Sequence, residues 1–279
     1  MKIGYCTWGM PSVPVDKMIP FLAQTGYDGV ELTVIPGYTT ELDRLDRDER
    51  RRIARMLQDH HLELPAIAAQ TSMVDADPEI AARHWKRLTD AVDLAVDWAQ
   101  NGTPPAVDTT VGGRADQWDE LKPLLFERMG ALVRYGEQRG VVIAAEPTWN
   151  SMFYAIDHVR ELLHEIDSPY LKLNFDISHF NVRGYSIGES VTALARHTVH
   201  THVKDERGVV PNFQFLIPGE GEFDYVTYLH AMREQRYDGY ITAEIAQMVQ
   251  HRPDYEPFAA AEQTYRILAR AFEQAGIRR

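Results

Sequence analysis

Cysteine is almost missing from this chain. One cysteine, Cys6, occurs among 279 residues, so no disulfide can form within the chain, as expected of a protein from a reducing compartment. No run approaches the roughly 18 apolar residues that a membrane-spanning helix needs. The N-terminal MKIGYCTWGM lacks the apolar segment of a secretion signal. We therefore expect a cytoplasmic protein without a membrane partner.

Positive charge is also scarce. The chain has 29 Lys and Arg against 41 Asp and Glu, a net charge of −12, which argues against a nucleic-acid partner because phosphate binding needs a basic surface. A glycine-rich phosphate loop is missing as well, since the segment after the first expected strand reads TWGMPSVP. The remaining composition, 44% hydrophobic and 25% charged, is that of an ordinary globular protein.

Short apolar runs alternate with longer amphipathic stretches, which predicts parallel strand–helix units. The expected strands are 2–6, 28–32, 63–68, 105–109, 141–146, 170–176, 198–203 and 239–244. The expected helices are 15–25, 47–60, 78–100, 117–139, 155–166, 187–196, 224–235 and 257–275. Eight units without a low-complexity linker predict an α/β protein, a single (β/α)8 TIM barrel in one domain over residues 1–279. A doubly wound sheet is the disfavoured alternative, because the phosphate loop is missing.

Four of these apolar runs carry a residue of the metal-ligand type at or near the carboxyl end. They read VVIAAEP, LKLNFDISH, VHTHVKD and YITAEI, and they contain Glu146, Asp176, His202 and Glu244. Parallel strands bring their carboxyl ends to one rim, and strand alternation places these side chains on the inner face. Three carboxylates and one imidazole form an oxygen-rich donor set that favours Mn²⁺, Mg²⁺ or Co²⁺ over a structural zinc.

At these residues the chain resembles the xylose isomerase-like TIM barrel superfamily, the sugar phosphate isomerase/epimerase group, over nearly its whole length. The matching pieces are Glu146, the D-x-x-H of Asp176–His179, the H-x-H-x-K-D of His200–Asp205, the G-E-G-E of Gly219–Glu222, and Glu244 in TAEI. The resemblance implies that Glu146, Asp176, His202 and Glu244 hold one divalent cation, with Mn²⁺ expected and Mg²⁺, Co²⁺ or Zn²⁺ as alternatives. It also implies that His179 and Lys204 face the substrate and that Glu31 lies near the pocket.

The activity that the resemblance implies is isomerisation or epimerisation of a sugar, keto-sugar or cyclitol. In such relatives the glutamates that correspond to Glu146 and Glu244 move a proton beside a carbonyl, and the cation stabilises the enediolate. A lyase acting on keto-inositols or 3-keto-glycosides would use the same residues and remains the alternative. A zinc-dependent DNA-repair endonuclease and a non-catalytic barrel are further alternatives, disfavoured by the acidic charge and by the intact ligand set.

Several other residues follow the predicted strands at the same rim. Trp8 and Trp149 are expected to cover the C–H faces of a carbohydrate substrate, whereas Phe213 and Phe215 are expected to pack within their loop. Lys204 has two alternative interpretations: it contacts the substrate, or it forms an exposed ion pair with Asp205. The spacing of Arg183 and Arg207 assigns them no role. We also expect a homo-oligomer, by analogy with related barrels.

Overall fold

The computed structural model describes every residue from Met1 to Arg279. Eight parallel strands close into a barrel in the order β1-β10-β7-β6-β5-β4-β3-β2. They are β1 (Lys2–Cys6), β2 (Gly29–Thr33), β3 (Ala66–Ala68), β4 (Ala106–Thr109), β5 (Ile143–Ala145), β6 (Leu171–Asp176), β7 (Thr198–Val203) and β10 (Tyr240–Ala243). The predicted (β/α)8 TIM barrel is confirmed.

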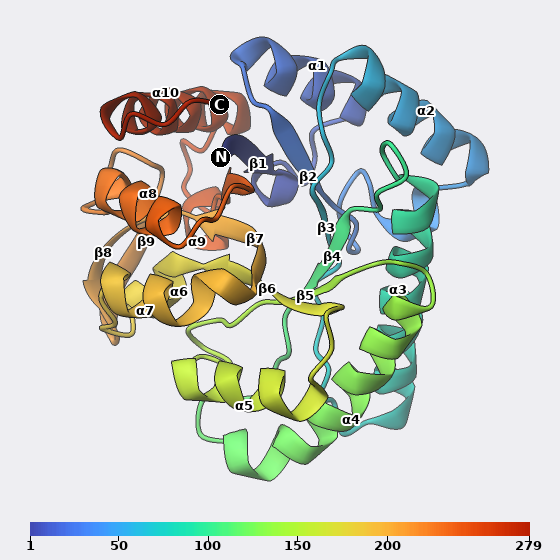
Figure 1. Cartoon of the computed structure of the whole chain (residues 1–279). Coiled ribbons are helices and arrows are strands. Elements are labelled where there is room, and N and C mark those ends of the chain that lie inside the picture. The colour runs from blue at the N-terminus through green and yellow to red at the C-terminus, as the bar shows by residue number, and fades with distance from the viewer.

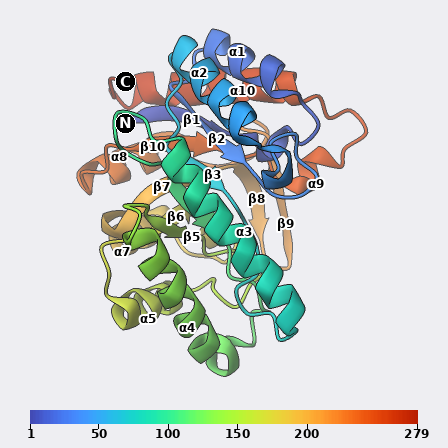
Figure 2. The same cartoon turned by 90° about the vertical axis from the view of Figure 1, so that its right-hand side faces the viewer.

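Helices surround the strands, as Figure 1 shows, and eight of them are the main helices of the barrel. They are α1 (Val15–Thr25), α2 (Arg47–Asp59), α3 (Pro78–Asp97), α4 (Trp118–Glu137), α5 (Ile156–Ile166), α7 (Ile187–Leu194), α8 (Tyr225–Glu234) and α10 (Pro257–Gln274). Local signals set several boundaries. Gly26 ends α1 with a φ of 110°, which favours glycine, and Ser186 and Glu189 form a capping box at α7. The two termini lie close together in both views (Figures 1 and 2).

The structure differs from the sequence-based expectation mainly in the loops. Residues 205–222, expected to be a loop, contain a hairpin of β8 (Asp205–Val209) and β9 (Asn212–Leu216) that packs beside two short helices, α6 (Ile177–Asn181) and α9 (Gln247–Gln250). Three 3₁₀ turns, η1 (Thr7–Gly9), η2 (Leu42–Arg44) and η3 (Ala195–His197), were not expected either. Strand β3 is shorter than predicted because Pro65 has no N–H to donate, although Glu63 still forms an isolated bridge with Gly29.

Two apolar clusters lie on the two faces of the barrel strands. One cluster of 64 buried hydrophobic residues fills the space between barrel and helices, and it includes Ile143 and Ala145. Inside the barrel a small layer of Ala66, Ala106 and Ala144 packs separately, which matches the predicted alternation. Several other buried residues on the strands are polar or charged: Glu31, Asp108, Asn174, Asp176, His200, His202 and Thr242. A buried polar layer therefore lies in the barrel. No helix has the length and apolar character that crossing a bilayer would require.

Candidate active site

Four side chains converge at the carboxyl end of the barrel. Glu146 follows β5, Asp176 ends β6, His202 lies on β7, and Glu244 follows β10. One ligand atom from each lies within 4.8 Å of the others, and all four residues are buried. Strand register causes this, because His202 is paired with Asp176 on one side and with Thr242 on the other. The structure thus brings together the four residues that the sequence singles out.

Two acidic residues hold the imidazole of His202. Its Nδ1 lies 3.1 Å from Glu146 Oε1, and its Nε2 lies 2.5 Å from Glu31 Oε2. Burial opposes a charge on His202, but Glu31, Glu244 and the other nearby groups together outweigh it and raise the pKa well above the usual range. Burial likewise opposes the charge of Glu31, yet His202 and His200 hold its pKa well below the usual range. Because Nε2 of His202 contacts Glu31, its Nδ1 faces the carboxylates of the four-residue cluster.

Glu31 lies behind the imidazole of His202 and not on the cavity wall. Glu31 is fully buried, does not line the cavity, and contacts His200 Nε2 at 3.3 Å as well as His202. Direct contact with a substrate does not fit this position. A carboxylate behind a metal-type histidine typically orients the imidazole, so Glu31 is placed to position His202.

Lys204 does not form the ion pair with Asp205 that we considered. Its ammonium group contacts Asp176 Oδ2 and Glu244 Oε2, and the residue is 2% exposed. Burial opposes the charge, but these two carboxylates raise the pKa of Lys204 above its usual range. The ammonium group also lies 5.6 Å from the centre of the Phe215 ring. Phe215 therefore forms part of the site wall, contrary to the expectation of simple loop packing, whereas Phe213 packs against Trp149.

Asp205 anchors a loop beside the hairpin. Its carboxylate accepts four backbone N–H groups, from Glu206, Gly219, Gly221 and Phe223, at 2.7–3.0 Å. A Cβ on Gly221 would lie 2.2 Å from Asp205 Oδ1, so glycine permits this close approach. The G-E-G-E segment is thus held by hydrogen bonds to a buried carboxylate.

We expect the Asp205→Ala variant to lower the free energy of unfolding by about 3 kcal/mol, because buried N–H groups lose a charged acceptor. Urea unfolding followed by circular dichroism would measure the loss. Asp254→Ala is the matched control, since Asp254 is exposed in a loop. Equal stability of Asp205→Ala and the wild type would show that the carboxylate does not hold the loop.

Sequence patterns did not identify Gln70 and Asp108 as site residues. Gln70 Nε2 donates to Glu146 Oε2 at 2.7 Å and to Asp108 Oδ2 at 3.1 Å. Burial and the nearby Glu146 raise the pKa of Asp108 well above its usual range. Burial also raises the pKa of Glu146, to about 7. A carboxyl group inside the apolar AVDTT run was the available signal for Asp108, but nothing in the sequence indicated Gln70.

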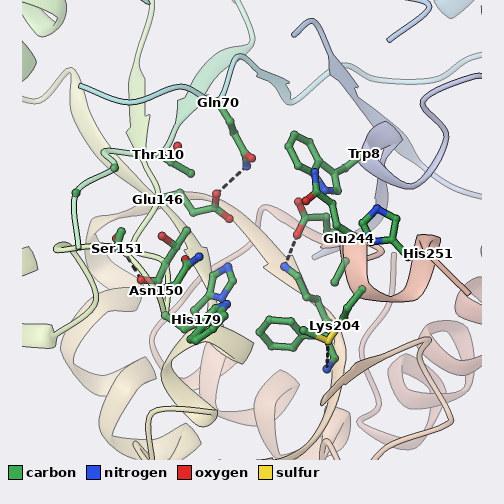
Figure 3. A pocket seen from close by; sticks show the side chains of 18 residues that line it. Trp8, Gln70, Thr110, Glu146, Asn150, Ser151, His179, Lys204, Glu244 and His251 are labelled. Carbon is green, nitrogen blue, oxygen red and sulfur yellow. Dashed lines mark hydrogen bonds and ion pairs between the residues drawn. The ribbon is translucent and has the colours of Figure 1, made fainter. Parts of the chain in front are cut away.

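A cavity of about 560 Å³ opens above the cluster (Figure 3). Its wall includes the following residues that the sequence predicts to be site residues: Trp8, Glu146, Trp149, His179, Lys204 and Glu244. Burial lowers the pKa of His179 to about 3, so its imidazole is neutral near pH 7. Arg183 and Arg207 do not line the cavity. Arg183 Nε donates to the carbonyl oxygen of Trp149 at 2.7 Å, and Arg207 pairs with Glu222.

Comparison with known proteins identifies the family. Residues 19–271 match the family model described as xylose isomerase-like TIM barrel. The chain belongs to this family.

Members of the family include curated sugar epimerases and dehydratases. Fructoselysine 3-epimerase from Shigella flexneri is 22% identical over 259 residues, which cover 91% of this chain and 93% of that protein. 3-Dehydroshikimate dehydratase from Bacillus anthracis is 23% identical over 211 residues, 74% of this chain and 72% of that protein. A crystal structure of IOLI protein with a bound zinc atom has a TM-score of 0.79 at 17% identity and covers 99% of this chain and 98% of that one. The predicted family resemblance is confirmed.

Proposed function

We propose that this protein is a divalent-metal-dependent isomerase or epimerase that moves a proton beside the carbonyl of a keto-sugar or cyclitol. The observation that supports this proposal is the pair Glu146 and Glu244. These carboxylates come from opposite sides of one cavity and belong to the same four-residue cluster (Figure 3). Epimerisation needs one group to remove a proton and another to return one from the opposite face.

The donor set suits a divalent cation. Glu146, Asp176 and Glu244 would supply oxygen ligands, and His202 would supply Nδ1 because Glu31 holds its Nε2. Such a set suits Mn²⁺, Mg²⁺ or Co²⁺, and Zn²⁺ is also compatible with it. The zinc atom bound to the related IOLI protein supports the use of a divalent ion in this fold. When bound, the cation supplies Lewis-acid polarisation of the substrate carbonyl.

The two glutamates have different partners. Glu244 Oε2 pairs with the ammonium group of Lys204, whereas Glu146 Oε2 accepts from the neutral amide of Gln70. In our proposal Glu244 Oε1 takes the proton when the C–H bond breaks, and the electron pair remains on the substrate as an enediolate. Glu146 then returns a proton to carbon. Burial raises the pKa of Glu146, which favours the protonated carboxyl group that this role needs.

A lyase is the second candidate function. Removal of the same proton could expel a hydroxyl group or an aglycone in place of reprotonation, and the dehydratase relative from Bacillus anthracis supports this possibility. The complete donor set does not favour a non-catalytic barrel. The substrate in either case would be a small carbohydrate-like molecule.

The test is incubation of the Mn²⁺-loaded protein in D₂O with ketoses, inososes and 3-keto-glycosides, followed by proton NMR. We expect loss of one C–H signal beside the carbonyl of at least one substrate, together with the appearance of its epimer or isomer. Loss of water or aglycone would identify the lyase. Retention of every such C–H signal across the panel would contradict both.

A further inference from the structure

The cavity wall offers no unpaired lysine or arginine to an entering ligand. Lys204 is the only lysine or arginine on this wall, and its ammonium group is already paired with Asp176 and Glu244. The imidazole of His179 already faces a carboxylate of the cluster, with its Nε2 3.4 Å from Asp176 Oδ2. The other histidine on the wall, His251, lies at the exposed rim beside Trp8 in Figure 3.

Arg183 and Arg252 on the loops around the cavity, and Arg128 on α4, are bound to other groups of the protein. Arg183 stacks on the Tyr154 ring at 4.0 Å in addition to its bond with Trp149. Arg252 pairs with Glu220 at 2.7 Å, and Arg128 donates to two backbone carbonyl groups. None of them lines the cavity. The bidentate guanidinium contact that commonly recognises phosphate or carboxylate is therefore missing from the wall.

The charges at the base of the cavity leave no surplus positive charge. Glu146, Asp176 and Glu244 would carry three negative charges when ionised, and His202 lies in contact with the carboxylate of Glu31. One divalent cation and the Lys204 ammonium group would together supply three positive charges, which balance the three carboxylates when all of them are ionised. An anionic substrate would therefore add unbalanced negative charge to a partly desolvated site, which is unfavourable.

Uncharged groups cover much of the remaining wall. Hydrogen-bonding side chains are supplied by the loops after β3, β4 and β5: Gln70, Thr110, Thr148, Asn150 and Ser151. Apolar and aromatic groups are supplied by Trp8, Phe215 and Met248. Figure 3 shows Thr110, Asn150 and Ser151 across the cavity from Trp8. Hydroxyl groups can bond to the first side while C–H faces pack on the second, a combination suited to a neutral polyol.

We propose that this site selects uncharged polyhydroxy ketones and discriminates against anionic ones, both sugar phosphates and ring ketones that carry a carboxylate. This inference rests on the proposed function of the same site, but it concerns binding and can be measured without turnover. It would also separate this chain from a relative whose substrate is an acid, because an unpaired lysine or arginine favours the binding of an acid and this wall lacks one.

The experiment compares matched ligands by isothermal titration calorimetry, with and without Mn²⁺. The pairs are D-fructose with D-fructose 6-phosphate, and the methyl ester of 3-dehydroshikimate with the free acid. We expect the neutral member of each pair to bind at least tenfold more tightly. Equal or tighter binding of the anionic members overturns the inference, as does the lack of binding by both neutral members.

A variant supplies the converse test. Gln247 is an exposed residue of the cavity wall, and Gln247→Arg adds a free guanidinium group there. We expect it to raise the affinity for the anionic members roughly tenfold, since hydrogen bonds to charged groups are the strong ones, and to change the neutral members little. Gln247→Met is the neutral control. An unchanged preference in Gln247→Arg contradicts the charge argument.

Failure of this inference can be told from failure of the proposed function. Tight binding of neutral ligands without any C–H exchange would remove the enzymatic proposal and leave the charge selectivity intact. Proton exchange on an anionic ketone, at a rate equal to that on its neutral counterpart, would remove the charge selectivity and leave the enzymatic proposal intact.

Discussion

We expect Glu244→Gln and Glu146→Gln each to reduce kcat by about 10²- to 10⁴-fold, the usual contribution of general acid–base catalysis. Glutamine keeps the size of the side chain but cannot take a proton from carbon. The two residues lie on the wall of one cavity, so the reacting carbon of a single substrate can lie within reach of both. Exchange of the substrate C–H for deuterium, followed by NMR, measures proton removal directly.

The same variants should be compared for bound cation, because both residues are also candidate ligands. A variant that keeps the cation yet loses proton exchange assigns the glutamate to catalysis. Glu262→Gln is the control, since Glu262 is exposed on α10 and does not line the cavity. Wild-type turnover in either Glu146→Gln or Glu244→Gln would remove that residue from the catalytic role.

The second large effect concerns the cation. We expect dialysis against a chelator to abolish proton exchange and added Mn²⁺ to restore it. A ligand that binds the folded state alone, present at 100 times its dissociation constant, stabilises that state by about 2.7 kcal/mol. For a chain of this size that corresponds to a rise in Tm of roughly 5 °C. Differential scanning fluorimetry with and without Mn²⁺ measures the shift.

Asp176→Asn provides the comparison for this experiment. Asp176 is a member of the cluster but does not itself line the cavity, so its replacement is expected to weaken cation binding while Lys204 keeps its contact with Glu244. The Tm of the Asp176→Asn variant should respond much less to Mn²⁺ than the Tm of the wild type. A wild-type Tm and activity that are indifferent to both chelator and Mn²⁺ would exclude the proposed cation dependence.

The barrel could be predicted from the sequence because the patterns that indicate its strands and helices are local in the sequence. Each β-run is apolar and short, each helix carries an amphipathic pattern, and eight repetitions close one fold. The convergence of Glu146, Asp176, His202 and Glu244 could also be predicted, since strand direction and side-chain alternation fix both the rim and the face. These two rules need no knowledge of loop conformation.

Loop-dependent contacts could not be predicted in this way. Lys204 and Asp205 are neighbours in sequence, yet they face different groups: Lys204 contacts Asp176 in the barrel, and Asp205 binds the backbone of residues 219–223. Gln70 reaches Glu146 only because of the path that the loop after β3 takes. Strand β8 is polar, DERGV, so it gave little strand signal before its pairing with β9 was known.

The four clustered ligand candidates belong to the barrel strands or follow them directly, whereas Trp8, Asn150, Met248 and most of the remaining wall come from the connecting segments. This separation has a practical meaning for protein engineering. New ligand preferences could be introduced by exchanging one connecting segment at a time, while the reactive carboxylates keep their rigid support. Such libraries would vary what the protein accepts and leave intact the groups expected to perform the chemistry.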